Sequence, residues 1–144
     1  MKNKFGFILV KPQIGENIGA CARSLKNFGF SKLHIVSPKQ SWPNNKAKAT
    51  SVGAYDIVKK AKIYNNTYDA ISDFNIVISL SARKRDVNKK HISINQFLKM
   101  VKLKKKTNFG LMFGPEASGL SNDDLSLSNY VLQIPTSKKF KSLN

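Results

Sequence analysis

Short apolar runs alternate with helical patterns along most of this chain. A short apolar run bounded by turn residues predicts a buried strand, whereas apolar residues three or four apart predict one face of a helix. On this basis, strands are expected at residues 5–10, 32–36, 62–64, 75–80, 108–113 and 130–134. Helices are expected at residues 17–28, 47–61, 67–74 (with Thr67 as N-cap) and 93–101, and another begins after Ser121. The alternation predicts an α/β fold with a mostly parallel sheet and helices on both faces, built as one domain over residues 1–144.

Four loops leave the carboxyl ends of these predicted strands and hold most of the unusual residues of the chain. They span residues 11–17, 79–86, 114–119 and 135–144. Parallel strands end at the same edge of a sheet, and ligands of such folds bind beyond that edge. We therefore expect residues that are far apart in sequence to form one site there.

The charge balance points to a polyanionic partner, with one competing explanation. The 144 residues include 25 Lys and Arg against 8 Asp and Glu, a net charge of +17. Nucleic acid is the first candidate for such a partner. However, 22 of the basic residues are Lys and 14 residues are Asn, which a coding bias toward A and T would also produce. Both explanations stay open for the bulk of the lysines.

Composition excludes several classes of protein. A single cysteine, Cys21, excludes an internal disulfide framework and a multi-cysteine metal site, and two histidines do not suggest a metal centre. The longest apolar run, at residues 5–10, is far shorter than the roughly 20 residues that a membrane-spanning helix needs. We therefore expect a cytoplasmic protein that binds neither a metal nor a membrane.

Arginine and glutamate are rare in this chain. The three arginines are Arg23, Arg83 and Arg85, and the two glutamates are Glu16 and Glu116. Each of the five lies in or beside a loop of glycines or small residues that follows an apolar run. In a chain this poor in arginine, each guanidinium is expected where a flat, bidentate donor is needed.

The loop after the first predicted strand leads into a helix. Residues 12–20 hold two glycines and then the helix start, where free backbone N–H groups attract anions. Their spacing matches neither a dinucleotide-binding motif nor a Walker loop. We expect Asn17 and Arg23 to reach the same part of the sheet edge, and the competing interpretation is a helix cap followed by a solvent-facing arginine.

Two later loops have the residues that close approach of a ligand requires. Small side chains at residues 79–82 let a flat ring lie against the backbone, with the basic residues 83–85 pointing outward, although an ordinary basic loop would have the same composition. In the other loop, Gly114 and Gly119 allow close approach or positive φ, and Glu116 is placed at the edge. A tight turn explains the glycines but not a glutamate in a glutamate-poor chain.

Three ordered motifs resemble those of a known enzyme family. The residues NIGACAR at 17–23 resemble the first motif of the SpoU/TrmH branch of the SPOUT RNA methyltransferases. The residues FGPE at 113–116, followed by GL at 119–120, resemble the second motif of that branch. The residues IP at 134–135 with SLN at 142–144 resemble the start of its third motif. The resemblance covers essentially the whole chain.

The stretches at residues 81–83 and 42–44 are most similar to the TrmJ group of this family. That similarity implies 2′-O-methylation of the ribose of tRNA nucleotide 32, in the anticodon loop, with S-adenosylmethionine as methyl donor. It also implies a homodimer with its sites at the subunit interface, and an α/β trefoil knot in which the C-terminal segment is tucked through a loop. A related enzyme acting on ribosomal RNA or another tRNA position, and an inactive RNA-binding remnant, are the alternatives.

The resemblance also implies roles for individual residues. The positions that match the catalytic motifs are Asn17, Arg23, Glu116, Ser142 and Asn144. Cofactor contacts are implied for Ser79, Leu80, Ser81, Ala82, Phe113, Gly114, Pro115, Gly119, Ile134, Pro135, Ser142 and Leu143. RNA contacts are expected for Arg23, Arg83, Lys84 and Arg85. Because a guanidinium hardly ever loses its proton, we expect Arg23 to clamp phosphate and stabilise developing negative charge rather than act as a base. Glu116 is expected to orient either Arg23 or loop amides.

The family continues beyond the Ser-Leu-Asn motif with a helix that completes the knot and the dimer. The present sequence stops at Asn144. We therefore expect this chain to lack that helix, with an incomplete knot and an unfinished last cofactor loop.

Overall fold

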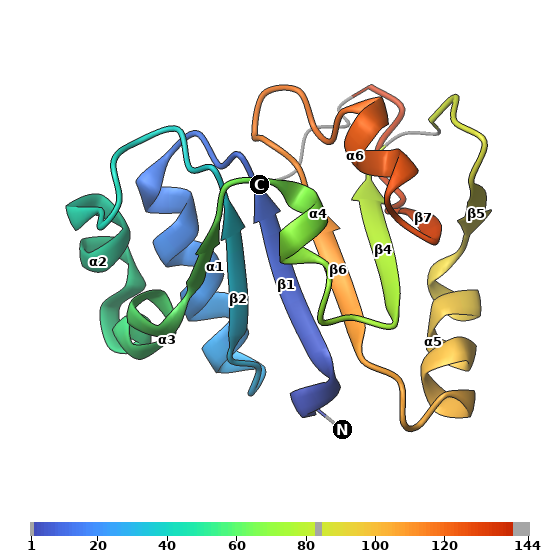
Figure 1. Cartoon of the computed structure of the whole chain (residues 1–144), viewed down its shortest axis with the longest axis horizontal. Coiled ribbons are helices and arrows are strands. Elements are labelled where there is room, and N and C mark those ends of the chain that lie inside the picture. Colours follow the sequence, from blue (N-terminus) through green and yellow to red (C-terminus); the bar gives the residue numbers. More distant parts are fainter. Residues whose placement is uncertain (1, 83–84, 140–144) are drawn as a thin grey trace.

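Parallel strands form one seven-stranded sheet in the computed structural model, which describes residues 2–82 and 85–139 (Figure 1). The strands are β1 (Phe5–Val10), β2 (Lys32–Val36), β3 (Lys62–Tyr64), β4 (Ile76–Ser81), β5 (Lys90–Ile92), β6 (Phe109–Phe113) and β7 (Tyr130–Gln133). They lie in the order β3-β2-β1-β6-β4-β7-β5, and each neighbouring pair is parallel. The predicted parallel α/β sheet is confirmed.

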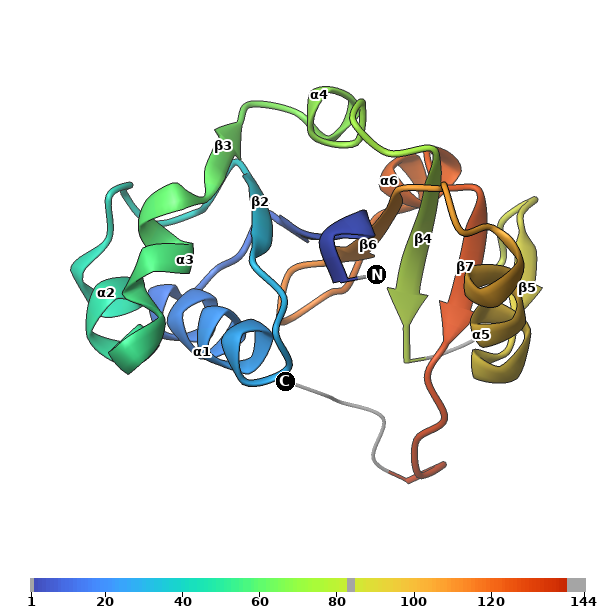
Figure 2. The same ribbon diagram turned by 90° about the horizontal axis from the view of Figure 1, so that it is seen from below.

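Helices cover both faces of this sheet, as predicted. They are α1 (Gly15–Asn27), α2 (Asn45–Ser51), α3 (Tyr55–Lys60), α4 (Thr67–Ala70), α5 (Ile94–Leu103) and α6 (Asn122–Ser126), with 3₁₀ turns η1 (Lys2–Lys4) and η2 (Val52–Ala54). Helices α1, α2, α3 and α5 pack on one face, whereas α4 and α6 pack on the other (Figure 2).

The alternation of side chains along β1 shows why both faces need cover. Phe5, Phe7 and Leu9 belong to the apolar clusters beneath α1 and α5. Ile8 and Val10 are fully buried in the cluster beneath α4 and α6. A strand that is apolar on both sides is stable only between two layers of helices, which is the arrangement typical of parallel sheets.

The helix expected at residues 47–61 is divided into α2, η2 and α3. The division falls at Val52, whose φ of 50° lies in the left-handed region and interrupts the helical hydrogen bonds. The change of direction lets Ala54, Ile57 and Val58 join Ala47 in the cluster beside α1. Tertiary packing therefore overrides the continuous helical pattern of this segment.

Two other local predictions need correction. Asn66, rather than Thr67, caps α4, because its side-chain oxygen accepts the Asp69 N–H at 2.8 Å. Strand β5 was not predicted, because it has only three residues and owes its conformation to its pairing with β7. The Ser121 cap of α6 is confirmed, since its hydroxyl accepts the Asp124 N–H at 3.1 Å.

The parallel register brings the predicted loops to one edge of the sheet. Leu9 of β1 is paired with Phe113 of β6, so these two neighbouring strands end almost level. Strand β4 lies between β6 and β7, with Ser81 paired to Gln133. The loops after β1, β6, β4 and β7 therefore begin side by side. The knot depends on residues 140–144, which lie outside the described residues, and stays a prediction.

Candidate active site at the carboxyl edge of the sheet

One carboxylate joins the loops that follow β1 and β6. Glu116 accepts hydrogen bonds from the backbone N–H groups of Gln13 at 2.8 Å and Ile14 at 2.9 Å. The side-chain amide of Asn17 donates to the same carboxylate at 3.0 Å. In return, the Ala117 N–H donates to the side-chain oxygen of Gln13 at 2.8 Å. We call this set of hydrogen bonds the Glu116 clamp, and it connects segments 103 residues apart in sequence.

The clamp keeps Glu116 ionised. Desolvation on its own raises the pKa of this carboxyl group, but the hydrogen bonds from Gln13, Asn17 and Ile14 outweigh it and hold the pKa below its ordinary value. The carboxylate is thus a permanent acceptor at neutral pH. Of the two roles left open for Glu116, the structure shows the second: it orients loop amides and does not contact Arg23.

Gly114 allows the turn that presents Glu116 to close tightly. A Cβ atom at Gly114 would lie 2.2 Å from the backbone nitrogen of Leu120 and 2.3 Å from the carbonyl carbon of Gly119. Gly119 has a φ of 71°, a left-handed conformation that favours glycine, and its N–H donates to the Pro115 carbonyl at 2.9 Å. The close approach and the positive φ predicted for these glycines are both confirmed.

The ends of β4 and β7 lie next to each other beside this turn. The Ile134 N–H donates to the Ser81 carbonyl at 2.8 Å, which continues the pairing of the two strands past Gln133. Ser79 is fully buried, and its hydroxyl has no hydrogen-bond partner among the residues that the structure describes. Ser79, Ser81 and Ala82 give the end of β4 three small side chains, of which Ala82 is partly exposed.

The remaining predicted cofactor residues differ in burial. Leu80 is half-buried in the cluster beneath α5, and the Phe113 ring stacks on Phe7 with their centroids 6.5 Å apart. Pro135 is exposed. Five predicted site residues lie outside the described residues: Arg83, Lys84, Ser142, Leu143 and Asn144.

Asn17 and Arg23 occupy different parts of α1. Asn17 is held by Glu116 on the first turn, whereas Arg23 lies six residues later, about 9 Å further along the helix. Arg23 is exposed, and its guanidinium forms no hydrogen bond or ion pair with residues 2–82 or 85–139. The structure therefore brings Asn17 and Glu116 into contact and leaves Arg23 on the solvent side of the helix.

Arg85 does not point outward, contrary to expectation. Its guanidinium donates to the Leu120 carbonyl at 2.7 Å and to the Asn122 side chain at 3.4 Å, while its backbone N–H donates to His91 at 3.3 Å. The carbonyl that follows the Gly119 turn gives this arginine an acceptor that the sequence does not reveal. The prediction of an outward side chain is wrong for Arg85.

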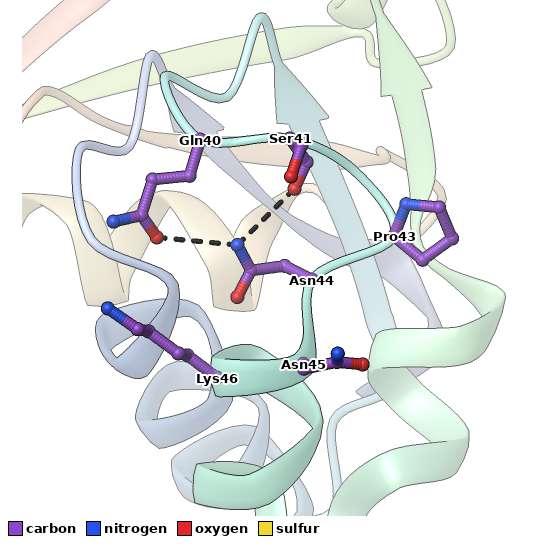
Figure 3. Close-up of a pocket in the computed structure, with 6 residues that line it drawn as sticks. All are labelled: Gln40, Ser41, Pro43, Asn44, Asn45 and Lys46. Carbon is purple, nitrogen blue, oxygen red and sulfur yellow. Dashed lines mark hydrogen bonds between the residues drawn. The ribbon is translucent and has the colours of Figure 1, made fainter.

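Two amide side chains that the sequence analysis missed support the loop after β1. The Gly15 N–H donates to the side-chain oxygen of Gln40 at 2.9 Å, and the Asn44 amide donates to the same oxygen at 3.3 Å (Figure 3). Asn44 also caps α2 by accepting the Ala47 N–H at 3.0 Å. An Asn before a helix is a recognisable cap, but the contact between Gln40 and Gly15 has no sequence signal.

Two titratable side chains lie in the core, away from the clamp. Cys21 of α1 packs, partly buried, against the apolar cluster that α1 shares with α2 and α3, and burial raises its pKa to about 11. His34 is buried in β2, with its Nδ1 3.1 Å from the Tyr64 hydroxyl. Desolvation, together with the charge of Lys62, lowers the pKa of His34 below 6.5.

The described residues show neither a metal site nor a membrane span. Within residues 2–82 and 85–139, no three His, Cys, Asp or Glu side chains are grouped so that they would ligate a metal ion. None of the helices in these ranges combines the length and the hydrophobicity of a transmembrane segment.

Comparison with known proteins agrees with this architecture. The tRNA (cytidine-2′-O-)-methyltransferase TrmJ of Methanocaldococcus jannaschii is 40% identical over 139 residues, which are 95% of this chain and 60% of that protein. The tRNA (cytidine/uridine-2′-O-)-methyltransferase TrmJ of Sodalis glossinidius is 32% identical over 145 residues, 100% of this chain and 56% of that protein. The crystal structure of TrmJ from Z. mobilis superimposes with a TM-score of 0.90 at 35% identity, covering 96% of this chain and 62% of that one.

The chain thus spans roughly three-fifths of the length of these relatives. The SpoU rRNA Methylase family matches residues 4–144, almost the entire sequence. That match includes both loops joined by the Glu116 clamp. This chain therefore belongs to the SpoU rRNA Methylase family.

Proposed function

We propose that this chain is an S-adenosylmethionine-dependent 2′-O-methyltransferase that acts on tRNA. The Glu116 clamp carries the proposal, because it joins Asn17 of the first family motif to the Gly114 turn of the second at one edge of the sheet. The tRNA (cytidine-2′-O-)-methyltransferase at 40% identity supports tRNA as the substrate class. The net charge of +17 suits a polyanion.

The described part of the edge fits an adenosine-containing cofactor. A flat base can lie against the backbone only where side chains are small, which holds for the partly exposed Ala82 after β4 and Gly114 after β6, whereas Ser79 and Ser81 of β4 are buried. We place S-adenosylmethionine along these residues and Ile134, held by their backbone groups. When bound, the cofactor would supply a methyl group from its positively charged sulfur: the S–C bond breaks to leave S-adenosylhomocysteine, the methyl group bonds to the ribose 2′-oxygen, and the hydroxyl proton passes to water.

Arg23 and Asn17 would act on the RNA. The guanidinium of Arg23 is exposed and permanently charged, so it can bind a phosphate and stabilise the negative charge that develops on the ribose oxygen. Glu116 accepts a hydrogen bond from the Asn17 side-chain N–H. This bond turns the Asn17 side-chain oxygen away from the carboxylate, so that the oxygen is available to a ribose hydroxyl. Glu116 itself is a positioning residue that acts through Asn17 and the loop amides.

We further propose nucleotide 32 of the anticodon loop as the target, and a homodimer as the active form. Ile14 and Phe28, at the two ends of α1, are 41% and 70% exposed. Ile14 adjoins the candidate site, Phe28 lies at the opposite end of the helix, and exposed apolar side chains at both ends of α1 suit contact with a second copy of the chain. Sedimentation equilibrium of the full chain tests the dimer, and a monomer at micromolar concentration would contradict it.

The methyltransferase proposal is tested with the full chain, labelled S-adenosylmethionine and unmodified tRNA. We expect a labelled ribose at nucleotide 32 when the product is mapped, and measurable heat of cofactor binding by calorimetry. Arg23→Ala should abolish turnover and leave cofactor affinity unchanged, whereas Ser24→Ala, which changes an exposed neighbour on α1, should retain turnover. A folded sample without heat of binding would favour the RNA-binding remnant, and a product in ribosomal RNA would contradict the tRNA assignment.

A further inference from the structure

The loop between β2 and α2 forms a shallow cavity, widely open to solvent, beside the candidate active site. The cavity has a volume of about 460 Å³ and is lined by Gln40, Ser41, Pro43, Asn44, Asn45 and Lys46 (Figure 3). None of these six residues is acidic, and one is a lysine. The cavity adjoins the loop after β1 directly, because Gln40 accepts the Gly15 N–H at 2.9 Å.

Hydrogen bonds determine the orientation of the Gln40 amide. Its oxygen accepts from two donors, the Gly15 N–H and the Asn44 amide. The Asn44 amide cannot be reversed, because its own oxygen accepts the Ala47 N–H at 3.0 Å. Reversing Gln40 would place its NH2 group against two donors. The NH2 group of Gln40 therefore points away from Gly15, on the side to which Lys46 extends (Figure 3).

The groups that remain for a ligand are mostly hydrogen-bond donors. Lys46 is exposed and takes part in no ion pair within the described ranges. An ammonium group, two amide N–H donors and the Ser41 hydroxyl match the acceptor oxygens of a phosphate group. In contacts between proteins and nucleic acids, such donors bind the backbone and set the register of the strand.

We propose that this cavity, which we call the Gln40–Lys46 subsite, binds a backbone phosphate of the RNA next to the methylated nucleotide. The inference rests on the proposed function, since it takes RNA as the substrate. The oxygen of Gln40 holds Gly15 while its nitrogen contacts the phosphate. A bound RNA strand therefore stabilises the position of Asn17, which lies two residues after Gly15.

Three matched variants of the full chain test the subsite. Gln40→Glu keeps acceptor oxygens for Gly15 and Asn44 but places negative charge where the phosphate would bind. Lys46→Gln removes the ammonium group. Lys48→Gln is the control, because Lys48 lies on the same helix but contacts the Tyr55 ring, 5.0 Å from its centroid, outside the cavity.

The readout is the dissociation constant of labelled tRNA, measured by fluorescence anisotropy over a series of salt concentrations. One phosphate contact contributes about 0.7 to the slope of log affinity against log salt for a single strand, which is about fivefold in affinity at 0.1 M salt. We expect Lys46→Gln to bind tRNA about fivefold more weakly, and Gln40→Glu to lose at least about fivefold in affinity. The control Lys48→Gln should change tRNA affinity less than twofold. An RNA of scrambled sequence should show the same losses, because phosphate contacts carry no sequence information.

The outcomes separate this inference from the proposed function. If the wild-type chain methylates tRNA while both cavity variants keep its affinity and salt slope, the subsite is refuted and the proposed function stands. A loss confined to RNAs with one particular base would assign the cavity to base recognition and contradict phosphate binding. Displacement of tRNA by millimolar inorganic phosphate, beyond the effect of matched chloride, would assign the cavity to free phosphate. If the subsite variants lose tRNA affinity while the wild type transfers no methyl group, the subsite stands and the proposed function fails.

Discussion

Replacing Glu116 with glutamine tests whether one carboxylate holds the two motif loops together. The substitution preserves the size of the side chain and removes its charge. The carboxylate accepts three hydrogen bonds, one at Oε1 from Gln13 and two at Oε2 from Ile14 and Asn17. Glutamine has one acceptor oxygen and one donor NH2 group. No orientation of the amide can therefore satisfy all three donors.

The expected loss in the free energy of unfolding follows from the more favourable of the two orientations of the glutamine amide. With the glutamine oxygen placed toward Ile14 and Asn17, two bonds survive as neutral ones, and the NH2 group faces the Gln13 N–H. A hydrogen bond to a charged group contributes about 1.5–3 kcal/mol and a neutral one about 1 kcal/mol. Because the loop is partly exposed, the lower end of that range applies. We expect Glu116→Gln to lower the free energy of unfolding by about 2–3 kcal/mol at pH 7.

The pH dependence supplies an independent check of the same reasoning. The pKa of Glu116 is lowered in the folded chain relative to its ordinary value of 4.5. Stabilisation by the charged form is therefore complete above about pH 5 and is lost as the pH falls through the lower, folded-state pKa. Urea unfolding of both proteins should show a difference at pH 7 that shrinks by pH 3.

A matched control is available because the chain has only one other glutamate. Glu16 lies on the first turn of α1 and is exposed, so Glu16→Gln should change stability by less than about 0.5 kcal/mol. Equal stability of Glu116→Gln and wild type at pH 7 would refute the clamp. A difference that stays constant down to pH 3 would show that the charge of Glu116 is not its cause.

Three further predictions concern Ser79, Gly114 and Cys21. Ser79→Ala should raise the free energy of unfolding by about 1 kcal/mol in urea titrations, because its buried hydroxyl lacks a partner in the described part of the chain. Gly114→Ala should lower it by about 2–3 kcal/mol, since a Cβ there meets backbone at 2.2 Å, whereas Gly53→Ala, whose Cβ would meet nothing within 4 Å, should be neutral or stabilising. Cys21, with a pKa of about 11, should react with a disulfide reagent at pH 8 much more slowly in the native chain than in urea.

Most of the sheet could be predicted because its strands are buried on both faces. Such strands appear in the sequence as short continuous apolar runs, and the expected bounds of β1 and β2 agree with the structure. The expected bounds of β3 agree as well, although it is a mostly exposed edge strand. Strand β5 has no such run, since it is three residues long and begins with Lys90 and His91. Its pairing with β7 decides its conformation, and a local pattern contains no information on that contact.

The parts of the candidate site that could be predicted are rare residue types that directly follow a predicted strand. Glu116 and Asn17 follow predicted strands in a chain with only two glutamates, and the structure places them in contact. Gln40 and Gln13 hold the same loops but could not be found, because amide side chains are abundant here and their contacts depend on tertiary packing. Arg85 shows a different error, since its rarity predicted an outward side chain, whereas its guanidinium donates to the Leu120 carbonyl.

The register of the sheet explains why the two motif loops can meet at all. Gln13 lies three residues after the last residue of β1, and Glu116 lies three residues after the last residue of β6. Because Leu9 pairs with Phe113, those strand ends differ by only one position. A shift of one residue in either strand would exchange the faces of its side chains and displace the carboxylate by about 3.3 Å, beyond hydrogen-bond reach of the loop amides. The distance of each motif loop from the end of its strand is therefore a geometric requirement of the parallel pairing between β1 and β6. Only at that distance can Glu116 accept the hydrogen bonds that join the two loops.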